Sequence, residues 1–174
     1  MPDGEVDRTL RLLWRQRLGG TQGSRGPRQR LSVDDVVRAA IERADERGDL
    51  AGLSMRAIAE RLEVGAMSVY TYVQSKEELM ALAVDEVVGH GQLPAHSGDL
   101  RTDLTAVADQ TWHELHAHPW LLQAPKSRPW IGPHVSARYE WQLGALEGIG
   151  LTDLEMDQAL AMVLGFTEAC ARDS

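Results

Sequence analysis

The chain has 174 residues, a formal net charge of −8 and one cysteine, Cys170. This length suits one or two small domains with a sizeable core, and a single cysteine excludes a disulfide framework within the chain. The lone cysteine, together with a sequence that has neither a signal-peptide core nor an apolar run of membrane length, predicts a cytoplasmic protein with no membrane partner.

Positive charge is concentrated at the N-terminus, since residues 1–31 contain seven arginines against three acidic residues. Residues 32–90 and residues 91–174 each carry a net charge of −6. We therefore treat the first region as a basic arm. Apolar residues at helical spacing predict a short amphipathic helix from about residue 5 to 18, which docks on its own domain or a neighbouring one: Val6, Leu10, Leu13 and Trp14. The glycine-rich stretch 19–27 then predicts a flexible linker.

Two helices are predicted ahead of a central turn. Ser32 followed by Asp35 is typical of a capping box, and apolar residues recur behind it at the i, i+3, i+4 spacing of one helix face. Ser54 is placed to cap the second helix. The turn 63–65 follows, in which Gly65 is free to adopt the left-handed conformation that such a turn can require.

A short third helix follows the turn and carries small polar and aromatic side chains. Helical spacing assigns an inner set, Ala66, Val69, Tyr70 and Val73, and an outer set, Met67, Ser68, Thr71 and Tyr72. Ser75 and Glu78 predict a second capping box, at the start of a longer helix that reaches about His90. A short helix set off by a tight turn is typical of a helix-turn-helix DNA-binding domain.

The remainder of the chain is also predicted to be helical. After a polar break at 89–98, helices are expected over about 100–118 and 134–147. Thr152 and Glu155 predict a capped final helix. No alternating apolar run is long enough for a strand, so the predicted fold class is all-α.

Several motifs resemble those of a known family. In the helix-turn-helix region they are LSMRAIAERL (53–62), VGAMSVYTYV (64–73) and SKEEL (75–79). Residues 32–90 resemble the N-terminal DNA-binding domain of the TetR (tetracycline-repressor-like) family of bacterial regulators. Shorter matches make residues 91–174 resemble a tetracycline-repressor-type C-terminal domain: HPWL (118–121), SRP (127–129) and GFT (165–167) with Cys170. The resemblance implies a three-helix helix-turn-helix domain followed by a helical ligand-binding and dimerisation domain.

The resemblance further implies a homodimer that binds double-stranded operator DNA. Carried over position by position, the family's DNA contacts fall on Met55, Arg56, Ala66, Met67, Ser68, Tyr70, Thr71, Tyr72 and Lys76. Arg56 suits a bidentate contact to guanine, and Lys76 suits a phosphate contact. Ala66 has no hydrogen-bonding group to read a base, while Met55 and Tyr70 also fit the core. Three arginines just ahead of the first helix either enter the minor groove or stay in a solvated tail: Arg25, Arg28 and Arg30.

The resemblance also implies that residues 91–174 enclose a pocket for an unknown small-molecule effector whose binding releases the operator. Large rings supply the candidate pocket residues: Trp112, His116, Trp120, Trp130, Trp141 and Phe166. For any one of the tryptophans, ordinary core packing is the favoured interpretation. The sequence ends at Ser174, inside the helix that would begin the dimer bundle, so either the chain is incomplete there or dimerisation is reduced.

No metal, cofactor or enzymatic activity is predicted. His113 and His116 have a workable i, i+3 ligand spacing, but no cysteine or paired carboxylates accompany them. The magnesium-chelating histidine of the tetracycline-binding relatives falls on Ala124, which cannot ligate. The sequence has no phosphate-binding loop, nucleophile elbow or HExxH motif. The alternative left open is a helical small-molecule-binding protein, or an enzyme, without operator-specific DNA binding.

Overall fold

The computed structural model describes residues 3–18, 31–124 and 131–174. They form nine helical segments: α1 (Asp3–Leu13), α2 (Val33–Arg47), α3 (Met55–Arg61), α4 (Ala66–Tyr72), α5 (Lys76–Gly89), α6 (Leu100–Ala117), the 3-10 helix η1 (Pro119–Gln123), α7 (Pro133–Gly144) and α8 (Asp153–Asp173). This part of the chain contains no strand, and the predicted all-α class is confirmed. Within the same residues, no helix combines the length and the apolar character needed to span a bilayer.

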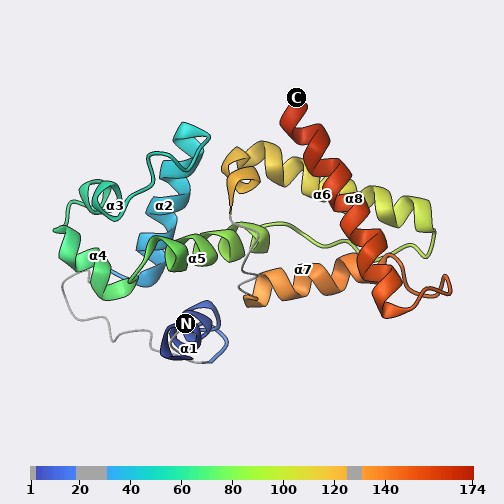
Figure 1. Cartoon of the computed structure of the whole chain (residues 1–174), viewed down its shortest axis with the longest axis horizontal. Coiled ribbons are helices and arrows are strands. Elements are labelled where there is room, and N and C mark those ends of the chain that lie inside the picture. Colours follow the sequence, from blue (N-terminus) through green and yellow to red (C-terminus); the bar gives the residue numbers. More distant parts are fainter. Residues whose placement is uncertain (1–2, 19–30, 125–130) are drawn as a thin grey trace.

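The helices gather at the two ends of an elongated molecule (Figure 1). Helices α2, α3 and α4 lie at one end, α6, α7 and α8 at the other, and α5 runs between them. The helix-turn-helix half has the larger core, in which Val36, Ile58 and Val69 are completely buried. The other half has a smaller core around Val107 and Leu160, where α6 packs on α8.

Local capping explains where most of these helices begin. At α2, Ser32 accepts a hydrogen bond from the Asp35 backbone and the Asp35 carboxylate accepts one from the Ser32 backbone, which is the predicted capping box. Thr152 and Glu155 form the same reciprocal pair at the start of α8. The second predicted box is only half formed: Ser75 accepts from the Glu78 backbone, whereas the Glu78 carboxylate turns elsewhere.

Helix α7 is attached to the connecting helix α5 by polar contacts from two of its turns. Oδ1 of Asp85 in α5 accepts hydrogen bonds from the backbone of His134 at 3.1 Å and of Val135 at 2.9 Å, and so caps α7 from another helix. Burial raises the pKa of Asp85, while these two backbone donors oppose the rise. One turn further along α7, Arg138 donates to the Val88 carbonyl at 3.0 Å. Helices α5 and α7 are therefore held together as one unit.

A second junction joins η1 to α2. Trp120 is completely buried in the core of the helix-turn-helix half, although it lies in the C-terminal part of the sequence. Its indole nitrogen donates to Oδ1 of Asp45 in α2 at 2.7 Å, and His118 Nδ1 donates to the same oxygen at 2.7 Å. Trp120 thus belongs to the interface between the two halves of the molecule.

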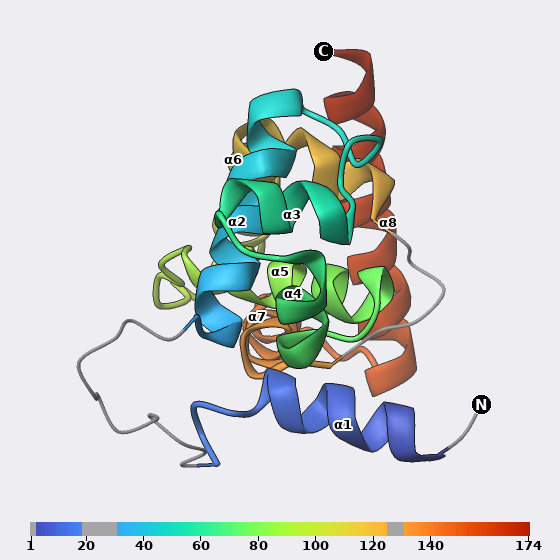
Figure 2. The same ribbon diagram turned by 90° about the vertical axis from the view of Figure 1, so that its left-hand side faces the viewer.

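Helix α1 packs against α5, close to α4 and to the start of α7 (Figure 2). Leu13 is buried in the helix-turn-helix core, whereas Val6 and Leu10 remain about two-fifths exposed. The sequence prediction of an amphipathic helix that docks on the protein is confirmed. The helix ends at Leu13, and residues 14–18 continue as turns rather than as helix.

Candidate nucleic-acid interface

The turn between α3 and α4 differs in one detail from the sequence prediction. The left-handed residue is Glu63, with φ of 54°, and not Gly65, which is extended at φ −67° and stands at the N-cap of α4. The side chain of Glu63 is exposed to solvent in this left-handed conformation, which is uncommon for residues other than glycine. Ser54 caps α3 as predicted, because its hydroxyl accepts a hydrogen bond from the Ala57 backbone.

The predicted inner and outer faces of α4 also need a correction. Val69 and Val73 are completely buried, and Tyr72 packs half-buried against the same core. Tyr70 is instead 42% exposed. The predicted inner place of Tyr70 and outer place of Tyr72 are therefore exchanged, and Ala66, which was also predicted to face inward, is exposed. The reason is helical spacing, since residues 69, 72 and 73 follow the i, i+3, i+4 pattern of one face.

The outer surface of α4 is formed by most of the residues that the sequence assigned to DNA contact. Met67 is 78% exposed, and other exposed members of the predicted set are Arg56, Ala66, Ser68, Tyr70, Thr71 and Lys76. Met55 and Tyr72 are the exceptions, because Met55 is 7% exposed in the core and Tyr72 is half-buried against it. The surface combines hydroxyl groups, a thioether and a phenol, which suits contacts to base edges and phosphates.

The two cationic side chains near this surface have intramolecular partners. Arg56 donates to Glu60 at 3.0 Å, within α3. Lys76 Nζ donates to the Leu50 carbonyl at 3.2 Å. Both side chains are exposed, so these contacts compete with water and can be exchanged for a phosphate or a base at small cost.

The turn between α4 and α5 is organised by one buried carboxylate. Glu78 is 5% exposed, and its Oε2 accepts a hydrogen bond from the Gln74 backbone at 2.6 Å. Its other oxygen faces Arg8 and Thr9 of α1, at 3.3 and 3.5 Å. Sequence reasoning missed this role, because the residues that meet Glu78 are about seventy positions earlier in the chain.

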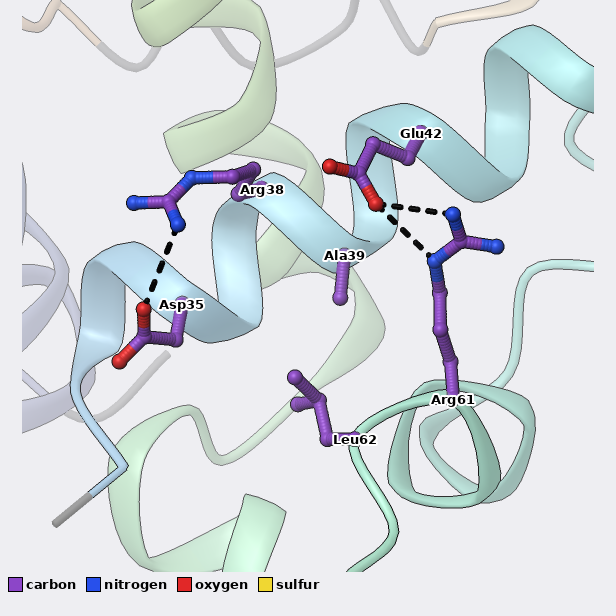
Figure 3. Close-up of a pocket in the computed structure, with 6 residues that line it drawn as sticks. All are labelled: Asp35, Arg38, Ala39, Glu42, Arg61 and Leu62. Carbon is purple, nitrogen blue, oxygen red and sulfur yellow. Dashed lines mark hydrogen bonds and ion pairs between the residues drawn. The ribbon is translucent and has the colours of Figure 1, made fainter. Parts of the chain in front are cut away.

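A groove between α2 and α3 is lined mainly by charged side chains that are paired with one another (Figure 3). Arg61 of α3 donates to Glu42 at 2.8 Å and to Glu46 at 2.9 Å, and the hydrogen bonds to these two carboxylates raise its pKa. Arg38 faces Asp35 at 3.6 Å. The groove therefore ties α3 to α2 and offers neither an apolar pocket nor an unpaired positive charge.

The predicted effector-contacting residues lie in several different places. The rings of Trp112 and His116 contact each other along α6, tilted by 36° with their centroids 4.2 Å apart. Trp141 stacks on His96 at 5.5 Å, and its indole donates to the Pro94 carbonyl. Phe166 is 73% exposed on α8. Of the described members of the predicted set, only Trp112 and His116 are thus shown in ring contact with each other.

Four predicted site residues lie outside the described residues: Arg25, Arg28, Arg30 and Trp130. Within the described parts of the chain, no group of three or more histidine, cysteine or acidic side chains is placed to hold a metal ion. His113 Nδ1 donates to the Asp109 carbonyl and His118 to Asp45, so these two histidines serve separate local contacts.

A buried ion pair in the C-terminal half was not anticipated from the sequence. Arg138 of α7 donates to Glu114 of α6 at 2.9 Å, and Arg138 is only 5% exposed. One further nitrogen of Arg138 and one oxygen of Glu114 are buried without a hydrogen-bond partner. The i, i+3, i+4 spacing that identifies a buried helix face is a pattern of apolar residues. It therefore gives no signal for a buried charged pair of this kind.

Two protein families match the sequence, and together they cover most of its length. Residues 36–83 match the family described as "Bacterial regulatory proteins, tetR family". Residues 93–174 match the "Tetracyclin repressor-like, C-terminal domain". The first match contains α3 and α4, and the second contains α6, α7 and α8.

Curated relatives extend the similarity across nearly the whole chain. The HTH-type transcriptional repressor DrrR1 of Streptomyces coeruleorubidus is 43% identical over 171 residues, which cover 97% of this chain and 62% of that protein. An HTH-type transcriptional regulator of Saccharopolyspora erythraea is 36% identical over 137 residues, 78% of this chain and 58% of that protein. The chain therefore spans about three-fifths of the length of these relatives.

Solved structures show the same arrangement of helices. ActR of Streptomyces coelicolor in complex with actinorhodin superposes with a TM-score of 0.75 at 26% identity, over 84% of this chain and 68% of that one. Apo ActR gives a TM-score of 0.74 at 26% identity, over 86% of this chain and 70% of that chain.

Proposed function

Since the chain belongs to the TetR family of bacterial regulatory proteins, we propose that it is a transcriptional repressor that leaves its operator when a small molecule binds. The observation that carries this proposal is the outer surface of α4, where exposed polar and aromatic side chains stand on a short helix fixed to a rigid core. We assign residues 1–31 to a basic arm, 32–90 to DNA binding and 91–174 to regulation.

We propose that Met67, Ser68, Tyr70 and Thr71 of α4 meet the major groove, with Arg56 beside them and Lys76 on a phosphate. Ala66, at the N-terminus of α4, lies close to DNA without reading a base. Tyr72 contributes through its half-buried ring and through the position of its backbone. Arg25, Arg28 and Arg30 remain candidates for phosphate or minor-groove contacts ahead of α2.

A homodimer is supported by the exposed surface of α8. Small and apolar residues form a continuous stripe along this helix that nothing in the described chain covers: Ala161, Met162, Gly165, Phe166 and Ala169. Met162 and Phe166 are 76% and 73% exposed. An apolar helix face of this kind suits packing against a second copy of itself. Pairing would place two α4 helices about 34 Å apart, one turn of duplex DNA, or somewhat further.

The effector is proposed to bind in the C-terminal half, beside Trp112, His116 and Trp141. The solved relative ActR forms a complex with actinorhodin, and this supports a small-molecule effector without identifying it. Phe166 and Trp130 remain candidates from the sequence. Trp120 is assigned to the core, because it is completely buried against α2.

Release of DNA follows from the attachment of α7 to α5. A ligand lowers operator affinity only if it binds more tightly to a form in which the two recognition helices are wrongly spaced. Asp85 and Arg138 hold α7 on α5, so movement of α7 would tilt α5 and displace α4. A coupling free energy of about 1–3 kcal/mol would change DNA affinity by about 5- to 150-fold.

The family consists of transcriptional regulators, and no enzymatic activity is proposed. The alternative, a ligand-binding protein without operator recognition, differs in one measurable respect. It would bind all DNA sequences with equal and weak affinity, whereas a repressor prefers its operator.

The matched variants Arg56→Ala and Lys76→Ala test the assigned DNA contacts. Arg56→Ala is expected to weaken binding to a preferred duplex by about 1–3 kcal/mol with little change on unrelated DNA, because it removes a base contact. Lys76→Ala should weaken binding to both duplexes alike and reduce the slope of log K against log salt by about 0.9, because it removes a phosphate contact. Fluorescence anisotropy over a series of salt concentrations measures both quantities.

The two variants serve as controls for each other, since each removes one exposed positive charge. A change of sequence preference in Lys76→Ala would contradict its phosphate role. Equal losses on both duplexes in Arg56→Ala would contradict its base contact.

A further inference from the structure

Helix α1 contacts the recognition helix at the point where that helix ends. Nη2 of Arg8 donates to the carbonyl oxygen of Tyr72, the last residue of α4, at 3.1 Å. Nε of the same guanidinium lies 3.3 Å from Oε1 of Glu78, in the first turn of α5. One arginine therefore bridges the last turn of α4 and the first turn of α5.

The partner of Arg8 is unusually well fixed. Glu78 is buried, and its second oxygen accepts from the Gln74 backbone at 2.6 Å within the α4–α5 turn. Thr9 of α1 is 1% exposed and its hydroxyl is 3.5 Å from the same carboxylate. A buried carboxylate with several donors holds its geometry, because each lost donor leaves a desolvated charge.

The other end of α1 is anchored on elements outside the recognition helix. Leu13 is 3% exposed in the core of the helix-turn-helix half. Just after the helix, Arg15 Nε donates to Asp34 of α2 at 3.0 Å. The indole of Trp14 donates at 3.0 Å to the carbonyl of Ile131, two residues before α7. The described N-terminal segment thus connects α2 and the start of α7 with the end of α4.

We propose that α1 is a brace that positions the recognition helix, and that Arg8 is its positioning residue. The proposal rests on the proposed function, in which α4 reads the operator. Arg8 acts on DNA binding by holding the Tyr72 carbonyl and the Glu78 carboxylate in register, without touching DNA. Helix α5 runs between the two halves of the molecule (Figure 1). Helix α1 is a second link between them, independent of the α5 backbone.

The two-point contact explains why arginine suits this position. A guanidinium presents donors in a fixed planar fork, so it can satisfy a carbonyl and a carboxylate at once. A lysine has the same charge but a single nitrogen, and it cannot reproduce both contacts. The same difference separates a brace from a phosphate contact, because a lysine serves a phosphate nearly as well as an arginine does.

The test compares Arg8→Ala and Arg8→Lys with Arg11→Ala as the matched control. Arg11 is on the same helix and 73% exposed in its side chain, and its ion pair is with Asp7 of α1 itself. The probes are a duplex enriched by the wild-type chain from random-sequence DNA, and a scrambled duplex. Both Arg8 variants are expected to bind the enriched duplex about tenfold more weakly, with an unchanged salt slope. Arg11→Ala should bind as the wild type does.

Amide hydrogen exchange of the DNA-free protein gives a second readout that needs no DNA. Backbone amides of residues 73–75 are expected to exchange about tenfold faster in both Arg8 variants, while the core amides of α2 keep the wild-type rate. This separates loss of the brace from general unfolding. If the wild type shows no preference for any duplex, the proposed function is refuted. Hydrogen exchange still measures the effect of Arg8 on residues 73–75 in that case.

Two results would overturn the brace. If Arg8→Lys bound like the wild type while Arg8→Ala lost affinity on both duplexes with a smaller salt slope, Arg8 would be a phosphate contact. If both Arg8 variants matched Arg11→Ala in binding and in exchange of residues 73–75, α1 would have no influence on the recognition helix.

Discussion

Replacing Trp120 by alanine is expected to lower the free energy of unfolding by about 3–5 kcal/mol, the range for deletion of a large buried aromatic side chain. Trp120 is completely buried, and it fills the junction between η1 and α2. The substitution removes the ring from this core together with the hydrogen bond to Asp45. Urea denaturation followed by circular dichroism measures the loss.

Trp120→Phe is the matched variant, because it keeps an aromatic ring and removes only the indole donor and some volume. It is expected to cost about 1–2 kcal/mol, since Asp45 keeps its contact with His118. A loss below about 1 kcal/mol in Trp120→Ala would contradict the core assignment, and would restore Trp120 to the wall of an effector pocket.

Phe166→Glu is expected to convert the proposed dimer to a monomer and to weaken binding to the proposed two-fold operator by at least about 100-fold. Phe166 is 73% exposed within one chain, so the substitution should change the stability of the isolated fold very little. In a pair of α8 helices it would bury two unpaired carboxylates at the interface. A monomer also loses the gain in affinity that comes from engaging both half-sites at once. Sedimentation velocity and DNA titration measure the two effects.

Leu18→Glu controls for the added charge, because Leu18 is 67% exposed and follows α1 rather than lying on α8. It should leave the sedimentation coefficient unchanged. A Phe166→Glu protein that remained dimeric would show that the exposed stripe of α8 is not the contact between the two copies.

The features that the sequence predicted well are the local ones. Caps such as Ser32 with Asp35 and Thr152 with Glu155 involve neighbours three residues apart, so the sequence alone contains the whole interaction. The helix-turn-helix and the breaks between helices follow from the same local chemistry. The family assignment rested on contiguous motifs within residues 53–79, which are equally local.

The features that the sequence could not predict depend on distant partners. The exchange of Tyr70 and Tyr72 arises because α4 has only seven residues, so its periodicity is compatible with more than one inner face. Trp120 resembled a pocket residue because the C-terminal part of the sequence gives no indication that η1 packs on α2. The contact of Arg8 with Glu78 spans 70 positions and involves charged residues, for which helical periodicity gives no signal.

Recognition of a specific operator through α4 can be measured in one equilibrium experiment. The wild-type chain is titrated against a duplex that it has enriched from random-sequence DNA, and against a scrambled duplex of equal length in the same salt. We expect binding to the enriched duplex to be at least about 10³-fold tighter. Equal affinity for the two duplexes at every salt concentration would contradict this expectation.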